Sequence, residues 1–476
     1  MIATSPDIKK NIQDVFEKQQ AYAPQMKQTT AKERIKMIMK IDAFLRDGAN
    51  VTALEEAMKK DLRKHPVEVY ATEVGPVLAN IQHIKKNLRK WVRDKSVSTP
   101  IAMAGTSSWI RYEPKGVTLV IAPWNYPFML TVIPILYAIA AGNTVMVKPS
   151  EVSAHTTGFI HKMLDKFFDK QQVAVFEGDV PVSTALLEMP FNHIHFTGSP
   201  AVGKIVMKAA SKHLTSCTLE LGGKSPAIVD ESANISSMAE KLAWAKSLNN
   251  GQTCIAPDYL IVHESVKDKF LKELGKSFTK FFDKNGKGMQ ASNDYGRIIN
   301  DKNFARISGL IDDAVQKGAN VAFGAELDAS DKFMSPTVLT DMTDDMEIMH
   351  EEIFGPVLPV VTFKNKEEVI KIIGDKPKPL SLYIASKKNK NIDYFLEHTS
   401  AGGTVINDFM LGTSNPDLPF GGVNNSGIGK SLGHHSFVDF SNERGVIKRK
   451  WATLKMIFPP YNSGILTMVK QLYKWT

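Results

Sequence analysis

Apolar and polar positions along this 476-residue chain follow two different periods. In the N-terminal part, apolar side chains recur at the three- and four-residue spacing of one helix face, among many lysines and glutamates. This spacing predicts amphipathic helices over residues 6–20, 30–47, 51–63 and 67–92. Beyond residue 116, short apolar runs bounded by turn residues replace the helical period and predict strands.

The first predicted strands alternate with helical stretches. Five apolar runs lie between residues 117 and 223: VTLVIA, NTVMVKPS, VAVFEG, HIHFTG and CTLELGG. This alternation is typical of a doubly wound parallel sheet, in which ligands bind beyond the carboxyl ends of the strands. The polar or conformationally special residues Asn125, Lys148, Glu151, Gly198 and Glu220 fall at those ends. The sequence therefore predicts a ligand site at one edge of the sheet.

A second alternating series follows Gly222 and predicts a second α/β lobe. Its apolar runs are PAIVD, DYLIVH, VLPVVTF, LSLYIAS and TVIND, with helices expected over 234–249 and 265–283. Residues 94–116 contain few helix formers and alternate around SSWIRYE, which indicates an extended ribbon. The fold class is therefore α/β with two lobes and a small β element. The site is expected in the cleft between the lobes, and the glycine-dense segment 419–433 is expected as a loop over that cleft.

One stretch resembles a membrane span by composition alone. No residue from Gly116 to Val147 is charged, and the stretch is longer than the roughly 20 residues that a membrane helix needs. However, Pro123, Pro127 and Pro134 divide it into a strand, a turn, a helix and another strand. We therefore predict buried sheet core.

Composition narrows the class of protein. With 43% hydrophobic and 23% charged residues, the chain has an ordinary globular composition, and its length predicts two or three domains. Two cysteines cannot form a disulfide framework, and no zinc-ligand spacing occurs, so no metal site is expected. The charged N-terminus lacks the apolar core of a signal peptide, which favours a cytoplasmic protein.

The net charge of +9 is concentrated in the C-terminal tail. From Arg444 onward the chain has seven basic residues, no acidic ones, and several aromatic and aliphatic side chains, among them Ile457, Phe458, Tyr461 and Trp475. No apolar run in it is long enough to span a bilayer. Two interpretations stay open: peripheral association with an anionic membrane face, or packing along a partner subunit. The rest of the chain is nearly neutral, and we expect no nucleic-acid partner.

Two cysteines and one glutamate are candidates for chemistry. Cys254 follows the polar and small residues NNGQT, which suits an accessible nucleophile. Cys217 lies in an apparent strand and is interpreted as a small buried hydrophobic residue. Glu220, between two leucines and before two glycines, is costly to bury unless it has a partner or a function. A solvent-facing carboxylate at a strand end is the alternative for Glu220.

The segment FTGSPAVGK brings glycines to a strand-to-helix turn. Gly198 ends the predicted strand and Gly203 lies in the first turn of the next helix. Backbone N–H groups and the helix dipole at such a position can bind a pyrophosphate. Any tight strand-to-helix turn can also use two glycines, so the alternative is a structural turn.

Five segments together resemble the aldehyde dehydrogenase superfamily, most closely its class 3 or fatty aldehyde dehydrogenase branch. They are PWNYP, FTGSPAVG, LELGGKSP, GQTC and EEIFGPV, in this order. The resemblance extends over nearly the whole chain. It implies a two-lobed fold with a Rossmann-type parallel-sheet cofactor domain, an α/β catalytic domain and a small β-hairpin element for bridging and oligomerisation.

The resemblance also implies roles for particular residues. Cys254 would be the nucleophile, Glu220 the base that activates water, and Asn125 an oxyanion donor. The implied cofactor is NAD, with NADP as an alternative, because a carboxylate such as Glu151 disfavours a 2′-phosphate. The residues implied to bind the cofactor are Trp124, Lys148, Glu151, Gly198, Ser199, Gly203, Leu221, Glu352 and Phe354.

The expected function is oxidation of an aldehyde to the carboxylic acid through a cysteine thiohemiacetal and a thioester. The substrate is expected to be a medium- or long-chain aliphatic, other apolar, or aromatic aldehyde, and the protein a cytoplasmic homodimer. Two alternatives stay open: a semialdehyde or CoA-acylating dehydrogenase, and a non-catalytic structural or binding protein on this fold. The expected domains are 1–93 with 117–219 for NAD binding, 220–433 for catalysis, 94–116 with 434–451 for bridging, and 452–476 as the basic tail.

Overall fold

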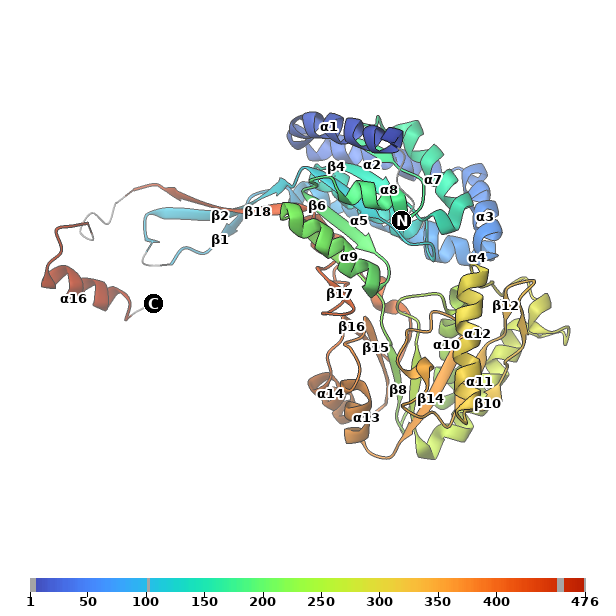
Figure 1. The fold of residues 1–476 in the computed structure, drawn as a ribbon. Helices are drawn as coiled ribbons and strands as arrows, with labels where there is room; N and C mark the ends of the chain where they lie inside the picture. The colour runs from blue at the N-terminus through green and yellow to red at the C-terminus, as the bar shows by residue number, and fades with distance from the viewer. Residues whose placement is uncertain (1–5, 101–102, 452–457, 475–476) are drawn as a thin grey trace.

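The computed structural model describes residues 6–100, 103–451 and 458–474. The chain forms two lobes joined along one side, and a long arm leaves the N-terminal lobe and ends in a helix (Figure 1). The tail residues Ile457 and Trp475 lie outside the described residues.

Helices form the N-terminal part, as predicted. Their bounds are α1 (Pro6–Gln28), α2 (Ala31–Leu45), α3 (Gly48–Leu62), α4 (Pro66–Val69) and α5 (Gly75–Trp91). The helix predicted over 67–92 is interrupted by one π-helical turn, Tyr70–Val74. Helix α2 begins at a capping box, in which the Thr30 side chain binds the Glu33 backbone and the Glu33 side chain binds the Thr30 backbone.

The first sheet has the strand order β17-β7-β6-β3-β4-β5. Five of its strands are parallel: β3 (Val117–Ile121), β4 (Thr144–Lys148), β5 (Val173–Val175), β6 (His193–Thr197) and β7 (Ser216–Glu220). The intervening helices are α6 (Met129–Ala141), α7 (Ala154–Phe167), α8 (Val180–Leu187) and α9 (Pro200–Ala210), with short turns at Glu151–Ser153 and Ser211–His213. The parallel α/β sheet of the first lobe is therefore confirmed.

The uncharged stretch from residue 116 to 147 is core, as predicted. It forms β3, α6 and β4, and every residue of both strands is buried. No helix among the described residues is long and apolar enough to cross a membrane. Pro123 and Pro127 lie in the turn between β3 and α6, and Gly142 ends α6 with a φ of 94°. Pro134, in contrast, lies inside α6 and does not break it.

The second sheet has the order β10-β13-β14-β9-β8-β15-β16. Its strands are β8 (Pro226–Val229), β9 (Tyr259–His263), β10 (Asn320–Phe323), β13 (Thr337–Thr340), β14 (Val357–Phe363), β15 (Ser381–Ala385) and β16 (Gly403–Ile406). All pairs are parallel except β10 with β13.

Five helices accompany this sheet: α10 (Ile235–Ser247), α11 (Lys267–Phe282), α12 (Asp301–Gln316), α13 (Lys366–Gly374) and α14 (Asn389–His398). A small hairpin, β11 (Leu327–Asp328) with β12 (Phe333–Met334), lies beside them. Short 3₁₀ turns occur at Leu248–Gly251, Glu264–Val266, Met289–Ala291, Glu347–Met349 and Leu411–Thr413. The central strands β8, β9, β13, β14 and β15 contribute residues to two apolar clusters, because both of their faces are buried. The edge strands β10 and β16 are largely exposed.

The arm contains the predicted extended ribbon. Strands β1 (Lys95–Val97), β2 (Thr106–Pro114) and β18 (Ser441–Arg449) form an antiparallel sheet in the order β1-β2-β18. Helix α15 (Gly433–Asp439) precedes β18, and helix α16 (Ser463–Leu472) follows it at the far end of the arm (Figure 1).

Candidate functional site

A cavity of about 430 Å³ lies between the two lobes. Residues from both sheets line it, because parallel strands bring their carboxyl ends to the same edge. Nine of the predicted site residues line this cavity: Trp124, Asn125, Gly198, Ser199, Glu220, Leu221, Cys254, Glu352 and Phe354. The structure therefore brings together segments that lie more than 200 positions apart in the sequence.

Three predicted residues do not line the cavity. Gly203 is buried in the first turn of α9, where a Cβ would lie 2.8 Å from the side chain of Leu221. Because Gly203 has no side chain, α9 can pack closely against Leu221, which does line the cavity. Lys148 and Glu151 form an ion pair at the carboxyl end of β4, with Lys148 buried and Glu151 exposed.

The loop before Cys254 has a special backbone. Asn249, Asn250 and Gly251 all have positive φ angles, of 50°, 56° and 71°. A Cβ at Gly251 would lie 2.3 Å from the carbonyl oxygen of Gly355, so only glycine fits there. The chain changes direction at this turn after α10, and Cys254 then lines the cavity.

Gln252 fixes this loop from behind. Its side chain donates to the carbonyls of Asn249 and Arg297 and accepts from the backbone N–H of Ile299, all at 2.9–3.0 Å. Gln252 is fully buried. The backbone carbonyl of Gln252 also accepts a hydrogen bond from the Asn125 side chain at 3.0 Å. Gln252 therefore connects the cysteine loop to Asn125.

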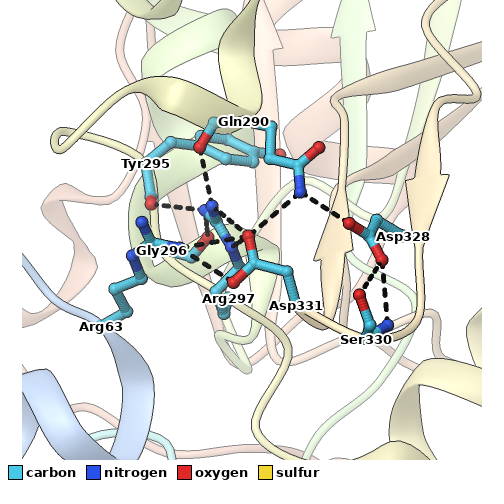
Figure 2. A network of polar contacts seen from close by, with 8 residues as sticks. All are labelled: Arg63, Gln290, Tyr295, Gly296, Arg297, Asp328, Ser330 and Asp331. Atoms are coloured by element: carbon cyan, nitrogen blue, oxygen red, sulfur yellow. Dashed lines mark hydrogen bonds and ion pairs between the residues drawn. The ribbon is translucent and has the colours of Figure 1, made fainter.

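Figure 2 shows a polar network around Arg297, the residue whose backbone carbonyl accepts a hydrogen bond from Gln252. The Arg297 guanidinium donates to the carbonyls of Gln290, Tyr295 and Gly296 and to the carboxylate of Asp331. Arg63, just after α3, binds the same carboxylate at 3.0 Å. The network thus ties the N-terminal helices to the second lobe directly behind the cysteine loop.

Asn125 lies in a tightly held turn. Its backbone carbonyl accepts from Lys64 Nζ at 3.0 Å and from Asn249 Nδ2 at 2.8 Å. Lys64 is itself fully buried and paired with Glu73. The Asn125 amide nitrogen carries two N–H groups, and the contact with Gln252 uses one, which leaves the other for an oxyanion.

The Cys254 thiol faces the cavity in a desolvated position. Its pKa is raised to about 12, mainly by burial and additionally by the nearby carboxyl groups of Glu352 and Glu220. The resting group is therefore a thiol at neutral pH, and it becomes a thiolate only when a base removes its proton.

Two buried carboxyl groups share the cavity. Burial raises the pKa of Glu220 to about 8, opposed by a hydrogen bond from Ser431. Burial also raises the pKa of Glu352 to about 8, with Asp258 adding to the effect. A Cβ at Gly222 would lie 2.1 Å from the Glu352 carboxyl oxygen, so the glycine makes room for this side chain.

The residues present fit a dinucleotide. Ser199 caps α9 and Gly198 precedes it, and Gly198, Ser199, Pro200 and Ala201 all line the cavity. The N-terminal end of an 11-residue helix, whose dipole favours an anion, therefore faces the cavity. Trp124 and Phe354 form an edge-to-face pair at 5.3 Å, which makes an apolar wall near Cys254. Phe354 adopts a φ of 50°, a backbone conformation that is uncommon for this residue type.

Several residues of the site were not predicted from sequence. Arg306 donates to the carbonyls of Glu352 and Ile353 and so holds the EEIFGPV segment. Ser431 belongs to the segment 419–433, which lies along β7 through β17 (Gly427–Ile428) and reaches the cavity with Asn425. No local pattern marks these residues, because their partners are distant in sequence.

The comparisons with known proteins agree with one another. The model of the aldehyde dehydrogenase family matches residues 2–446. A 4,4′-diaponeurosporen-aldehyde dehydrogenase of Staphylococcus aureus is 42% identical over 419 residues, covering 88% of this chain and 90% of the relative. The dimeric NADP-preferring aldehyde dehydrogenase of Mus musculus is 43% identical, covering 84% of this chain and 86% of the relative.

Among solved structures, the substrate-bound state of Staphylococcus aureus AldH is similar to this chain with a TM-score of 0.92 and 40% identity. The match covers 97% of this chain and 99% of that one. The likeness therefore includes both lobes and the connections between them.

Proposed function

This chain belongs to the aldehyde dehydrogenase family, and we propose that Cys254, Glu220 and Asn125 are the groups with which it oxidises apolar aldehydes. The chain is an NAD(P)-dependent oxidoreductase that converts small-molecule aldehydes to carboxylic acids. The observation that carries the assignment of the three groups is the single cavity that all of them line.

Cys254 attacks the carbonyl carbon as a thiolate, after its thiol proton has left to solvent. The raised pKa keeps the resting thiol protonated, and the neighbouring carboxyl groups, with pKa values raised to about 8, are largely protonated as well. The carbonyl oxygen becomes an oxyanion, to which the Asn125 amide and the Cys254 backbone N–H donate; one such donor contributes about 3 kcal/mol. NAD(P), when bound, supplies the acceptor for the hydride that leaves the tetrahedral carbon. A thioester then remains on Cys254.

Glu220 completes the reaction by taking a proton from water, whose oxygen bonds to the acyl carbon as the C–S bond breaks. Its raised pKa of about 8 supports this role, since a base near the working pH transfers protons most effectively. A chain that passed its acyl group to coenzyme A would have no need of a buried carboxyl group at this position. Hydrolysis is therefore the proposed release step.

The proposed cofactor contacts come from the carboxyl ends of β4 and β6 and from the second lobe. Gly198, Ser199 and the first turn of α9, with Gly203 and Leu221 beneath it, would hold the pyrophosphate. Lys148 and Glu151 would hold the adenosine ribose. Glu352 would hold the nicotinamide ribose, with Trp124 and Phe354 against the nicotinamide ring.

The substrate class is proposed from the relatives and the cavity wall. One relative is named as a 4,4′-diaponeurosporen-aldehyde dehydrogenase, and the edge-to-face Trp124–Phe354 pair lines the cavity. We propose medium- or long-chain aliphatic and aromatic aldehydes. A panel of purified aldehydes that differ in chain length, assayed by NADH or NADPH formation, tests this class.

The proposed domains follow the two sheets and the arm. They are 1–93 with 117–219 for the cofactor, 220–433 for catalysis, 94–116 with 434–451 as the bridging element, and 452–476 as the tail. Within 220–433, the short strand β17 pairs with β7 of the first sheet, so this part of the chain would join the two domains.

The proposed assembly is a homodimer in the cytoplasm. The support is the arm, whose strand β18 has an outer edge in the sheet order and mostly exposed side chains. Such an edge offers unpaired backbone groups to another chain. Sedimentation velocity should give about twice the 52.7 kDa of one chain; a single-chain mass would contradict the dimer.

The proposed membrane contact is made by the tail. Helix α16 lies at the far end of the arm (Figure 1), and Phe458, Tyr461 and Leu466 are more than half exposed. Basic and apolar side chains together favour an anionic membrane surface. We propose that the tail touches the cytoplasmic face of a membrane peripherally.

Substitution of the two cysteines tests the proposed chemistry. Cys254→Ser should lower turnover by at least about 10³-fold, because a serine hydroxyl is far harder to ionise than a thiol. NAD binding, followed by calorimetry, should stay near normal. Cys217→Ala is the matched control and should be nearly silent, because Cys217 packs at the edge of a buried cluster. An active Cys254→Ser enzyme, or an inactive Cys217→Ala enzyme, would contradict the assignment.

A further inference from the structure

The carboxylate of Glu220 has one oxygen fixed and one free. Glu220 is the last residue of β7 and is buried. Its Oε1 accepts a hydrogen bond from the Ser431 hydroxyl at 2.5 Å, whereas its buried Oε2 has no hydrogen-bond partner. A buried carboxyl oxygen without a partner is unusual. The carboxylate is therefore held by one atom while the other stays available to a ligand or water.

Ser431 is itself fixed in place. Its backbone N–H and carbonyl form a reciprocal pair of hydrogen bonds with Phe420, at 2.6 and 3.0 Å. The neighbouring Lys430 ammonium donates to the carbonyls of Gly421 and Gly422 and closes the loop. Because the backbone of Ser431 is bound on both sides, its hydroxyl is presented to Glu220 by a rigid segment.

Backbone hydrogen bonds also join the loop to the strand of Glu220. Strand β17 pairs antiparallel with β7, with Gly427 opposite Glu220, and the Leu221 N–H donates to the Ser426 carbonyl at 3.1 Å. A Cβ at Gly421 would lie 3.2 Å from Glu220 Oε1 and 2.7 Å from the Gly429 carbonyl. The glycine therefore lets the loop approach the carboxylate closely.

Burial opposes the ionisation of Glu220. Its pKa is raised to about 8, mainly by burial with a smaller contribution from Asp439, and against the lowering effects of the Ser431 hydroxyl and Lys430. Across the cavity lie the Cys254 thiol and Glu352, whose pKa is also raised to about 8. The other titratable or charged side chains that line the cavity are Lys224, Arg306, His350 and Glu351. A hydroxyl donor favours the carboxylate over the carboxylic acid, since the carboxylate is the stronger acceptor.

We propose that Ser431 is a positioning residue for thioester hydrolysis, holding Oε1 of Glu220 so that Oε2 takes the proton from water. The inference rests on the proposed role of Glu220 as the base. In this step a water O–H bond breaks and its proton goes to Oε2. The water oxygen bonds to the acyl carbon, and the C–S bond breaks to leave the Cys254 thiolate.

Two measurements on Ser431→Ala test this role. Intact-protein mass spectrometry, after rapid mixing with aldehyde and NAD, follows loss of the acyl adduct from Cys254 between pH 6 and 10. Infrared titration of the protonated Glu220 carboxyl, assigned with Glu220→Gln, reports its pKa without any turnover. Without the hydroxyl, both the pKa and the acidic limb of hydrolysis should move upward by about 1 pH unit, because about one unit is what a hydrogen bond to a charged group contributes.

Below the pKa, this shift means about 10-fold slower hydrolysis at a given pH. Formation of the acyl adduct should keep its rate, since Cys254 and Asn125 are untouched. Ser431→Thr, which keeps the hydroxyl, should restore both the limb and the infrared titration. Ser426→Ala is the matched control from the same loop: its hydroxyl binds Val423 and not Glu220, so the limb should stay in place.

The outcomes separate this inference from the proposed base. If Glu220→Gln hydrolyses the adduct normally, the proposed role of Glu220 fails, and the inference with it. If Glu220→Gln accumulates the adduct but Ser431→Ala leaves the limb and the infrared pKa unmoved, only the inference about Ser431 is overturned. A limb that moves equally in Ser426→Ala would also overturn it, because loop shape and not the hydroxyl would then be responsible.

Discussion

At the scale of single residues, burial decides the protonation of the reacting groups. The pKa values of Cys254, Glu220 and Glu352 are all raised above their ordinary values, and burial is the first cause in each. A neutral thiol and neutral carboxyl groups share a desolvated cavity more easily than three anions. The resting site is therefore largely uncharged at neutral pH, and each group ionises only as the reaction requires.

The first prediction concerns Glu220→Gln. The first hydride transfer should survive as a burst of about one NADH per active site, whereas steady turnover should fall by about 10²–10⁴-fold because deacylation lacks its base. Stopped-flow absorbance resolves the burst from the steady phase. In the parent enzyme the deacylation rate should rise with pH through about 8, since only the ionised Glu220 accepts the proton. An unchanged steady rate in the variant would remove Glu220 from the mechanism.

The second prediction concerns Glu151→Gln and the choice of cofactor. Glu151 is exposed and paired with the buried Lys148. Removing the negative charge leaves the lysine unpaired and lowers repulsion of a 2′-phosphate. The ratio of kcat/KM for NADP to that for NAD should rise about 10-fold. A control, Glu177→Gln on a nearby exposed carboxylate bound to His161, should leave the ratio unchanged; an unchanged ratio in Glu151→Gln would assign the preference to another residue.

At the scale of elements, the cysteine loop is a rigid unit held by neighbours. It has three consecutive positive φ angles, at Asn249, Asn250 and Gly251, and Gln252 ties it to the segment held by Arg297. The Tyr126 hydroxyl also contacts the Thr253 hydroxyl at 2.7 Å. Backbone strain of this kind persists only where the surroundings fix it. The position of Cys254 therefore depends on residues that never touch the substrate.

The third prediction follows from that dependence. Gln252→Ala removes three buried hydrogen bonds, to Asn249, Arg297 and Ile299, and should destabilise the protein by about 3 kcal/mol. Differential scanning fluorimetry should show a lower unfolding temperature, and alkylation of Cys254 should change its rate. Gln290→Ala is the control: this side chain is partly exposed and binds only Asp328 and Asp331 (Figure 2), so the loss should be smaller. Equal losses in both variants would contradict the special role of Gln252.

At the scale of the whole molecule, two lobes supply the site and the arm and tail face outward. The two sheets present their strand ends to one cavity, while the arm leaves the first lobe (Figure 1). Helix α16, which contains Lys470, lies at the far end of this arm (Figure 1). The proposed chemistry and the proposed membrane contact thus belong to separate parts of the molecule, so we expect that each can be changed without the other.

The fourth prediction uses that separation. Full-length protein should sediment with vesicles that contain anionic lipid, and a chain ending at Lys450 should not, because each basic residue contributes about 1 kcal/mol near an anionic surface. The shortened chain should keep its activity on a short soluble aldehyde. Binding that persists without the tail, that survives high salt unchanged, or that is absent from the full-length protein would instead favour a tail packed along the partner subunit.

The sequence by itself determined the local elements and indicated which groups are proposed to react. Helical and strand periods predicted the two α/β lobes, the ribbon around SSWIRYE, and the core character of residues 116–147, because these depend on which faces each segment buries. The five motifs indicated the family, and the comparisons confirmed it. Those motifs also named Cys254, Glu220 and Asn125, because a nucleophile, a base and an amide donor are visible as residue types in distinctive surroundings.

Only the tertiary structure decided how these groups are held and how they ionise. The pKa of Glu220 depends on burial and on Ser431, a residue 211 positions away, and no periodicity relates the two. The clamp of Gln252 on Arg297 and the pairing of β17 with β7 arise in the same way, from contacts between distant segments. Desolvation and hydrogen bonding act through space, so they follow the packing of the chain and cannot be read from the order of its residues.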